Sequence, residues 1–164
     1  MCLPVPSTSI SQIVKMETKI LESLNFKVYT PTVHHFQGRF LKAAQLPKIH
    51  DLSSFILDGT LQSYTLLKYR PSQLAAASVY IARKVHYPNA RGWSPTLWKH
   101  TQYTEEDVMT VARDILLEHD KLYATGAVKE KYSKEKFGNV SNMHTERRLR
   151  SVLQSITQDM EYSR

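Results

Sequence analysis

RPSQLAAASVYIARKV, residues 70–85, is the stretch of this chain that most constrains how it folds. A helix is expected to begin at Pro71, because the missing N–H of a proline costs nothing at the first helical position. Ala75, Ala76 and Ala77 leave little side-chain bulk, and apolar residues recur on nearly every side of this helix. Such a helix is buried on most of its faces. We therefore predict a central helix with other helices packed around it.

Helical patterns continue on both sides of the central helix. Before the central helix we expect a helix over ISQIVKMETKILESL (10–24), a second that is capped by Thr30, has Pro31 at its first position and is ended by Pro47, and a third from about Leu52 to Lys68. After the central helix we expect a short helix at 95–100 and a longer one that is opened by a Thr104–Asp107 capping box and ends near Gly126. A weaker segment over 128–137 and an amphipathic tail helix over 147–160 complete the chain. No strand alternation competes with these patterns. The predicted fold class is all-α.

Glu17 stands out in the first of these helices. At about 100° of rotation for each residue it falls inside an apolar stripe. The stripe consists of Ile10, Ile13, Val14, Ile20, Leu21 and Leu24. A carboxylate in such a stripe is costly unless a donor or a cation meets it, so whatever covers the helix should bring a basic group. Glu17 is therefore a candidate recognition residue; the alternative is a local ion pair or a side chain at the stripe's edge that reaches water.

Length and cysteine content narrow the class of protein. A chain of 164 residues is expected to form one domain, and it is long enough to bury a hydrophobic core without disulfide bonds. Cys2 is the single cysteine, so no internal disulfide is expected and a reducing compartment is favoured. The start, MCLPVPSTS, has no secretory pattern, and no apolar run approaches the length of a membrane span. We expect a protein of the nucleus and cytoplasm with no membrane partner.

The net charge of +7 allows two kinds of partner. It is compatible with nucleic acid or with an acidic protein. Basic residues alternate with acidic ones in KEKYSKEKF (129–137), however, which is typical of a solvated surface. We therefore expect no nucleic-acid partner.

Signals for catalysis are weak. Only five glycines are present, and no phosphate-binding loop occurs among them. The seven histidines lack the HExxH spacing, and the adjacent His34 and His35 diverge on a helix, so they cannot clamp one ion. We predict a protein that is not an enzyme and that has no catalytic residues, no metal site and no cofactor.

Several motifs in a fixed order resemble the cyclins, specifically the mitotic A/B type. The motifs are KMETKILESLNF (15–26) followed by TPTVHHF (30–36), LKYRPSQLAAASVYIARKV (67–85), YTEEDV (103–108) and KEKYSKEKFGNVS (129–141). Together they cover roughly Ser9 to Ser141. The resemblance implies the last helix of the first cyclin repeat followed by the second repeat, a five-helix unit around the Ala-rich helix. The implied domains are an N-terminal segment at 1–28, the C-terminal cyclin repeat at 29–141 and a helical tail at 142–164.

The same resemblance implies a regulatory function. Cyclins activate cyclin-dependent Ser/Thr protein kinases in the cell cycle and do no chemistry themselves. Glu17 matches the glutamate of the family's Lys–Glu pair at the kinase interface, and its lysine partner belongs to the first repeat. Apolar positions that face the kinase match Leu21, Phe26 and Val28. The chain departs from the family at DGTLQS (58–63), where cyclins tend to carry a Glu-Leu step.

Most of the first repeat, including the family's substrate-docking patch, has no counterpart in this sequence, so a truncated cyclin is expected. The apolar face of the first helix would then lie uncovered, which predicts self-association; the alternative is that this helix folds back onto the second repeat. A nucleic-acid-binding cyclin-fold adaptor in transcription is the alternative function, and a helical scaffold without a kinase partner is a third.

Overall fold

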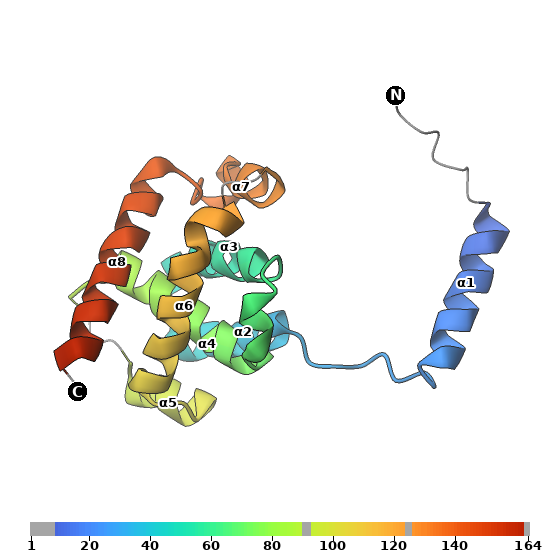
Figure 1. Cartoon of the computed structure of the whole chain (residues 1–164), viewed down its shortest axis with the longest axis horizontal. Helices are drawn as coiled ribbons and strands as arrows, with labels where there is room; N and C mark the ends of the chain where they lie inside the picture. The colour runs from blue at the N-terminus through green and yellow to red at the C-terminus, as the bar shows by residue number, and fades with distance from the viewer. Residues whose placement is uncertain (1–8, 90–92, 124–125, 163–164) are drawn as a thin grey trace. The chain divides into compact units, whose positions relative to one another are not determined.

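The computed structural model describes residues 9–89, 93–123 and 126–162, and the chain divides into two compact units, 1–30 and 31–164. The first unit contains α1 (Ile10–Ser23). The second contains α2 (Val33–Ala44), η1 (Pro47–Ile49), α3 (His50–Thr60), η2 (Thr65–Lys68), α4 (Pro71–His86), α5 (Pro95–Thr101), α6 (Glu105–Tyr123), α7 (Ala127–Tyr132), η3 (Glu135–Phe137) and α8 (Met143–Tyr162) (Figure 1). The described residues contain no strand, so the all-α prediction is confirmed.

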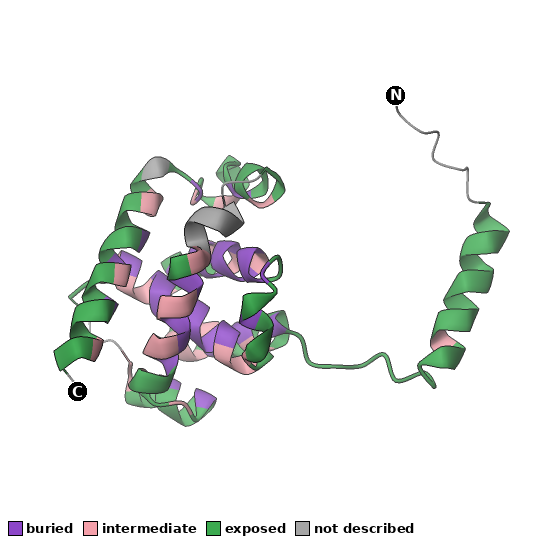
Figure 2. Cartoon of the chain, in the orientation of Figure 1, coloured by how far each residue is buried: buried purple, intermediate pink, exposed green. Residues whose placement is uncertain are grey.

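Helix α4 is the centre of the second unit, as predicted. It packs against α2, α3, α6 and α8, and most of its residues are buried (Figure 2). Ala75, Ala76 and Ala77 are fully buried. Pro71 occupies its first turn, and the Arg70 N–H donates to Gln73 Oε1 at 3.0 Å. Small side chains on α4 allow four helices to approach it, because they leave little bulk between the backbones.

A buried hydrogen-bonded chain links α2, α3 and α4. The Gln37 side-chain amide donates to the Ser53 hydroxyl at 3.0 Å, and the Ser53 and Ser78 hydroxyls are hydrogen-bonded to each other at 3.0 Å. Ser78 in turn donates to the Ala75 carbonyl at 2.8 Å. Each of these buried polar groups therefore has a partner, which removes the penalty of burying it.

Helix α2 begins later than predicted, at Val33 rather than at Pro31. Thr32 is its N-cap, and the Thr32 N–H donates to His35 Nδ1 at 3.4 Å. The Thr32 hydroxyl lies 3.0 Å from the same ring nitrogen. His35 thus takes the place that Glu or Gln usually has in a capping box. The expectation that Thr30 caps this helix is wrong, because the Thr32–His35 pair does so instead.

The predicted single helix from Leu52 to Lys68 is also wrong, because it is two elements, α3 and η2. The hydroxyls of Ser63 and Thr65 donate to the Glu118 carboxylate on α6. These tertiary hydrogen bonds hold the segment after Thr60 outside the helical path, since local propensity is a weak preference that tertiary contacts override.

Asp114 on α6 holds the next part of the same connection. Lys68 Nζ donates to the Asp114 carboxylate at 2.8 Å, and the Tyr69 hydroxyl donates to it at 2.6 Å. Burial favours a higher pKa for Asp114, but the hydrogen bonds from Lys68 and Tyr69 outweigh it and hold the pKa below its usual 3.8. Asp114 is therefore ionised at neutral pH and fastens η2 to α6.

The predicted boundaries of α5 and α6 are close to the observed ones, whereas the predicted segment 128–137 is two elements, α7 and η3, and α8 begins at Met143 rather than at Arg147. Ser94 caps α5 by accepting from the Leu97 N–H at 3.2 Å. The Thr104–Asp107 capping box is confirmed, with Thr104 N–H to Asp107 Oδ2 at 3.0 Å and Asp107 N–H to Thr104 Oγ1 at 3.2 Å. The predicted amphipathic tail helix is α8, which packs against both α4 and α6. Its buried residues Leu149, Val152 and Ile156 belong to the core of the second unit.

Candidate functional site

A Schellman motif ends α1 and shapes the segment that follows it. The Phe26 N–H donates to the Leu21 carbonyl at 2.8 Å, and the Asn25 N–H donates to the Glu22 carbonyl at 3.0 Å. Asn25 and Phe26 both have positive φ, at 48° and 56°. Asparagine tolerates that conformation well. The motif commonly brings together the side chains at the positions of Leu21 and Phe26.

The apolar stripe of α1 has the spacing of a coiled-coil seam. Ile10, Ile13, Glu17, Ile20 and Leu24 follow one another at alternating steps that average 3.5 residues. The four apolar members are between 48% and 81% exposed, and Glu17 is exposed as well. The described residues of this unit, 9–30, form no second helix that could cover this stripe. The seam is therefore a surface that can receive a partner helix.

All four predicted kinase-contact residues lie in this first unit. Glu17 and Leu21 stand one turn apart on α1, so they share a face. Phe26 and Val28 follow the helix and are 67% and 63% exposed. Leu21 is half-buried. The unit thus offers one carboxylate together with a short apolar surface.

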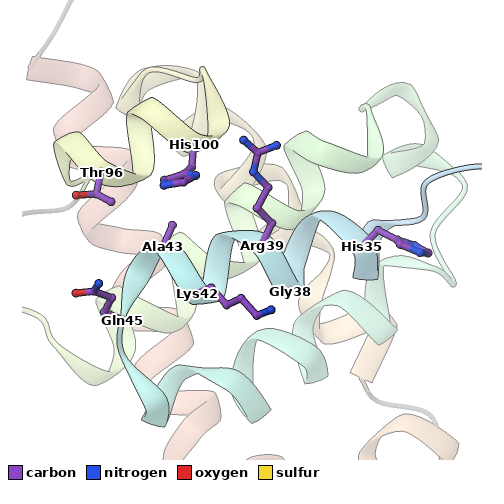
Figure 3. Close-up of a pocket in the computed structure, with 8 residues that line it drawn as sticks. All are labelled: His35, Gly38, Arg39, Lys42, Ala43, Gln45, Thr96 and His100. Carbon is purple, nitrogen blue, oxygen red and sulfur yellow. The ribbon is translucent and has the colours of Figure 1, made fainter.

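A groove between α2 and α5 was not predicted. Its volume is about 640 Å³, and its lining includes Arg39, Lys42, Ala43, Gln45, Thr96 and His100 (Figure 3). Arg39 extends from α2 toward α5, and His100 lies across from it on α5. The spacing of His35, Arg39 and Lys42 at i, i+4 and i+7 was visible in the sequence and could have shown a basic stripe on one face of the helix.

His86, at the end of α4, has an environment that disfavours its charged form. Its Nε2 is buried and has no hydrogen-bond partner among the described residues. Burial lowers the pKa of His86 below its usual 6.5, and the positive charges of Arg148 on α8 and Lys48 on η1 lower it further.

This environment predicts a loss of stability in mild acid. The unfolded chain protonates His86 at about pH 6.5, whereas the folded chain does so only at lower pH, so stability falls as the pH drops through 6.5 toward the folded pKa. The slope is at most about 1.4 kcal/mol per pH unit, the value for one proton. Urea midpoints of the wild type and of His86→Gln between pH 8 and 5 measure it. We expect a flatter profile for the variant; identical profiles would exclude His86 as the cause.

The described residues contain no group of three His, Cys, Asp or Glu side chains that could hold a metal ion. In the same part of the chain, no helix combines the length and the apolar character needed to cross a membrane. Cys2 lies outside the described residues. The α1 seam and the α2–α5 groove are two surfaces that suit binding of a partner.

Comparison with known proteins gives a consistent result. Residues 31–146 match the family described as "Cyclin, C-terminal domain". The chain is similar to Cyclin-B2-1 of Oryza sativa subsp. japonica, at 44% identity over 131 residues that cover 77% of this chain and 31% of that protein. It is also similar to Cyclin-B2-1 of Arabidopsis thaliana, at 37% over 135 residues (80% and 31%). A third relative is G2/mitotic-specific cyclin-1 of Medicago sativa subsp. varia, at 35% over 130 residues (77% and 30%). The chain spans less than a third of the length of these curated relatives.

Proposed function

Since this chain belongs to the cyclin family, with mitotic A- and B-type relatives, we propose that it is a regulatory subunit of a cyclin-dependent Ser/Thr protein kinase in mitosis. The observation that carries the proposal is the match of residues 31–146 to the C-terminal cyclin domain. Such a subunit acts through differential contacts with the active kinase conformation and supplies no catalytic group. We place its action in the nucleus and cytoplasm, because a chain with one cysteine favours a reducing compartment.

We propose that the kinase contacts the first unit at Glu17, Leu21, Phe26 and Val28. Two features support this assignment. The Schellman motif gives Leu21 and Phe26 a defined geometry, so an apolar contact there does not need to order a loose chain. Glu17, one turn from Leu21, adds a charge that selects for a basic partner group.

The charge of Glu17 also bears on self-association through α1. A symmetric pair of α1 helices centred on Glu17 would place two carboxylates opposite each other, whether parallel or antiparallel. Two like charges about 4 Å apart repel by roughly 1 kcal/mol in water and by about 4 kcal/mol near a protein surface. The seam therefore favours a partner helix that carries Lys or Arg over a second copy of the chain.

The test is capture of a mitotic cyclin-dependent kinase by this chain, with stimulation of kinase activity as a second measurement. We expect Glu17→Lys to weaken capture by about tenfold or more, because one opposite-charge contact becomes a repulsive one. Glu22→Lys is the matched control, since Glu22 lies on the opposite face of α1 and is also exposed. Equal loss in both variants would contradict the assignment of Glu17. Absence of both capture and stimulation by the wild type would overturn the proposed function.

The alternative is a nucleic-acid-binding adaptor in transcription, which the charge of +7 supports. Three of the lysines form ion pairs within the protein, Lys68 with Asp114, Lys129 with Glu146 and Lys131 with Asp58, and these pairs leave the net charge unchanged. This function predicts affinity for DNA that falls steeply as salt is raised. No binding at low salt would exclude it.

A further inference from the structure

We propose that the groove between α2 and α5 binds an acidic peptide segment of a partner protein. The proposal is independent of kinase binding, because it concerns only residues of the second unit. Arg39, Lys42 and His100 contribute to the lining of the groove, Thr96 adds a hydroxyl, and none of the lining residues that the structure describes is acidic (Figure 3). Arg and Lys bind carboxylates through charge-assisted hydrogen bonds.

The basic residues of this groove differ from three other lysines of the same unit. Lys68, Lys129 and Lys131 each have a carboxylate partner within the protein. Among the residues that the structure describes, no carboxylate pairs with Arg39 or Lys42. Both stand on α2 three residues apart, where like charges are mildly destabilising. An unpaired basic pair of this kind is complementary to an external anion.

Gly38 provides a second, independent observation. It lies exposed in the interior of α2, where glycine weakens a helix relative to alanine. A Cβ at this position would meet no atom within 4 Å, so packing inside the unit does not require glycine. Gly38 lines the basic groove and also an adjoining groove of about 520 Å³. The missing side chain keeps the two grooves connected across α2 and allows a peptide backbone to approach closely.

The adjoining groove defines the rest of the ligand. It is lined by Leu41, Leu46 and Pro47, which suit an apolar side chain next to the acidic ones. Arg39 points toward α5, whereas Lys42 points to the other side of α2 (Figure 3). The two charges therefore do not converge on one point, as a single phosphate would require. Separate carboxylates on either side of an apolar residue match this arrangement.

Fluorescence anisotropy with a labelled peptide, EELEE, tests the proposal on the full chain. This peptide places acidic residues on both sides of leucine, so its direction in the groove does not matter. We expect the double variant Arg39→Gln/Lys42→Gln to bind it about tenfold or more weakly, since two charge-assisted contacts are lost. The control Lys134→Gln/Lys136→Gln removes the same charge from exposed positions outside both grooves and should change binding less than twofold.

Two variants of Gly38 test the shape of the site separately from its charge. Gly38→Leu should weaken binding severalfold by filling the connection between the grooves, while circular dichroism shows an intact fold. Gly38→Ala should retain binding, because open space receives its methyl group. Equal binding by wild type and the Arg39/Lys42 variant would overturn the proposal. Tighter binding of the phosphoserine peptide EEpSEE than of EELEE would also overturn it. So would displacement of EELEE by duplex DNA that is as effective in the Arg39→Gln/Lys42→Gln variant as in the wild type.

Discussion

We expect replacement of Tyr132 by alanine to lower the free energy of unfolding by about 3–5 kcal/mol, because it removes a buried ring and leaves a cavity. Tyr132 is 3% exposed on α7. Its ring centroid lies 5.4 Å from that of Phe55 on α3 and 4.9 Å from that of Phe137 on η3. The ring thus fastens the α7–η3 segment to the core. Urea unfolding followed by far-UV circular dichroism measures the loss.

Tyr132→Phe separates the ring from its hydroxyl. The hydroxyl donates to Asp58 at 3.0 Å, and burial, followed by the charge of Asp58, raises the pKa of Tyr132 to about 12, so the donor stays protonated. Asp58 keeps its ion pair with Lys131, at 2.6 Å, in this variant. We expect a loss of about 1.5–3 kcal/mol, the net value of one hydrogen bond to a charged group. Equal losses for the phenylalanine and alanine variants would contradict the assignment of the stability to the ring.

The second large effect is expected at Leu149 on α8. This side chain is 1% exposed and lies in the core with Val152 and Ile156. Leu149→Ala should lower the free energy of unfolding by about 2–5 kcal/mol through lost burial and the cavity it leaves. The same urea titration measures this loss, and α8 should unfold in the same transition as the other helices.

Gln154→Ala is the matched control for Leu149. Gln154 is exposed on the same helix, so its replacement should change stability by no more than about 0.5 kcal/mol. If Leu149→Ala had as small an effect as Gln154→Ala, α8 would be a dispensable tail rather than part of the core. Comparison of the two variants therefore shows whether α8 stabilises the second unit or is a helical tail that adds nothing to its stability.

The candidate sites were predictable to different degrees. The apolar stripe of α1 and the position of Glu17 within it follow from helical periodicity, because both depend on residues close in sequence. The kinase-contact roles of Leu21, Phe26 and Val28 came from the resemblance to cyclins and remain proposals. The α2–α5 groove could not be predicted, since Arg39 and His100 are distant in sequence and meet only when α5 packs against α2.

Local signals in the sequence determined the number and order of the main helices, the Pro71 start of α4 and its central position. These features depend on periodicity, capping and side-chain size within one segment. Only the tertiary structure decided that the segment after Thr60 leaves the helix and that α8 is part of the core. Those outcomes rest on contacts between distant residues, such as Ser63 with Glu118. The free energy of such contacts exceeds the small helical preference of any one segment, and a local pattern contains no information about it.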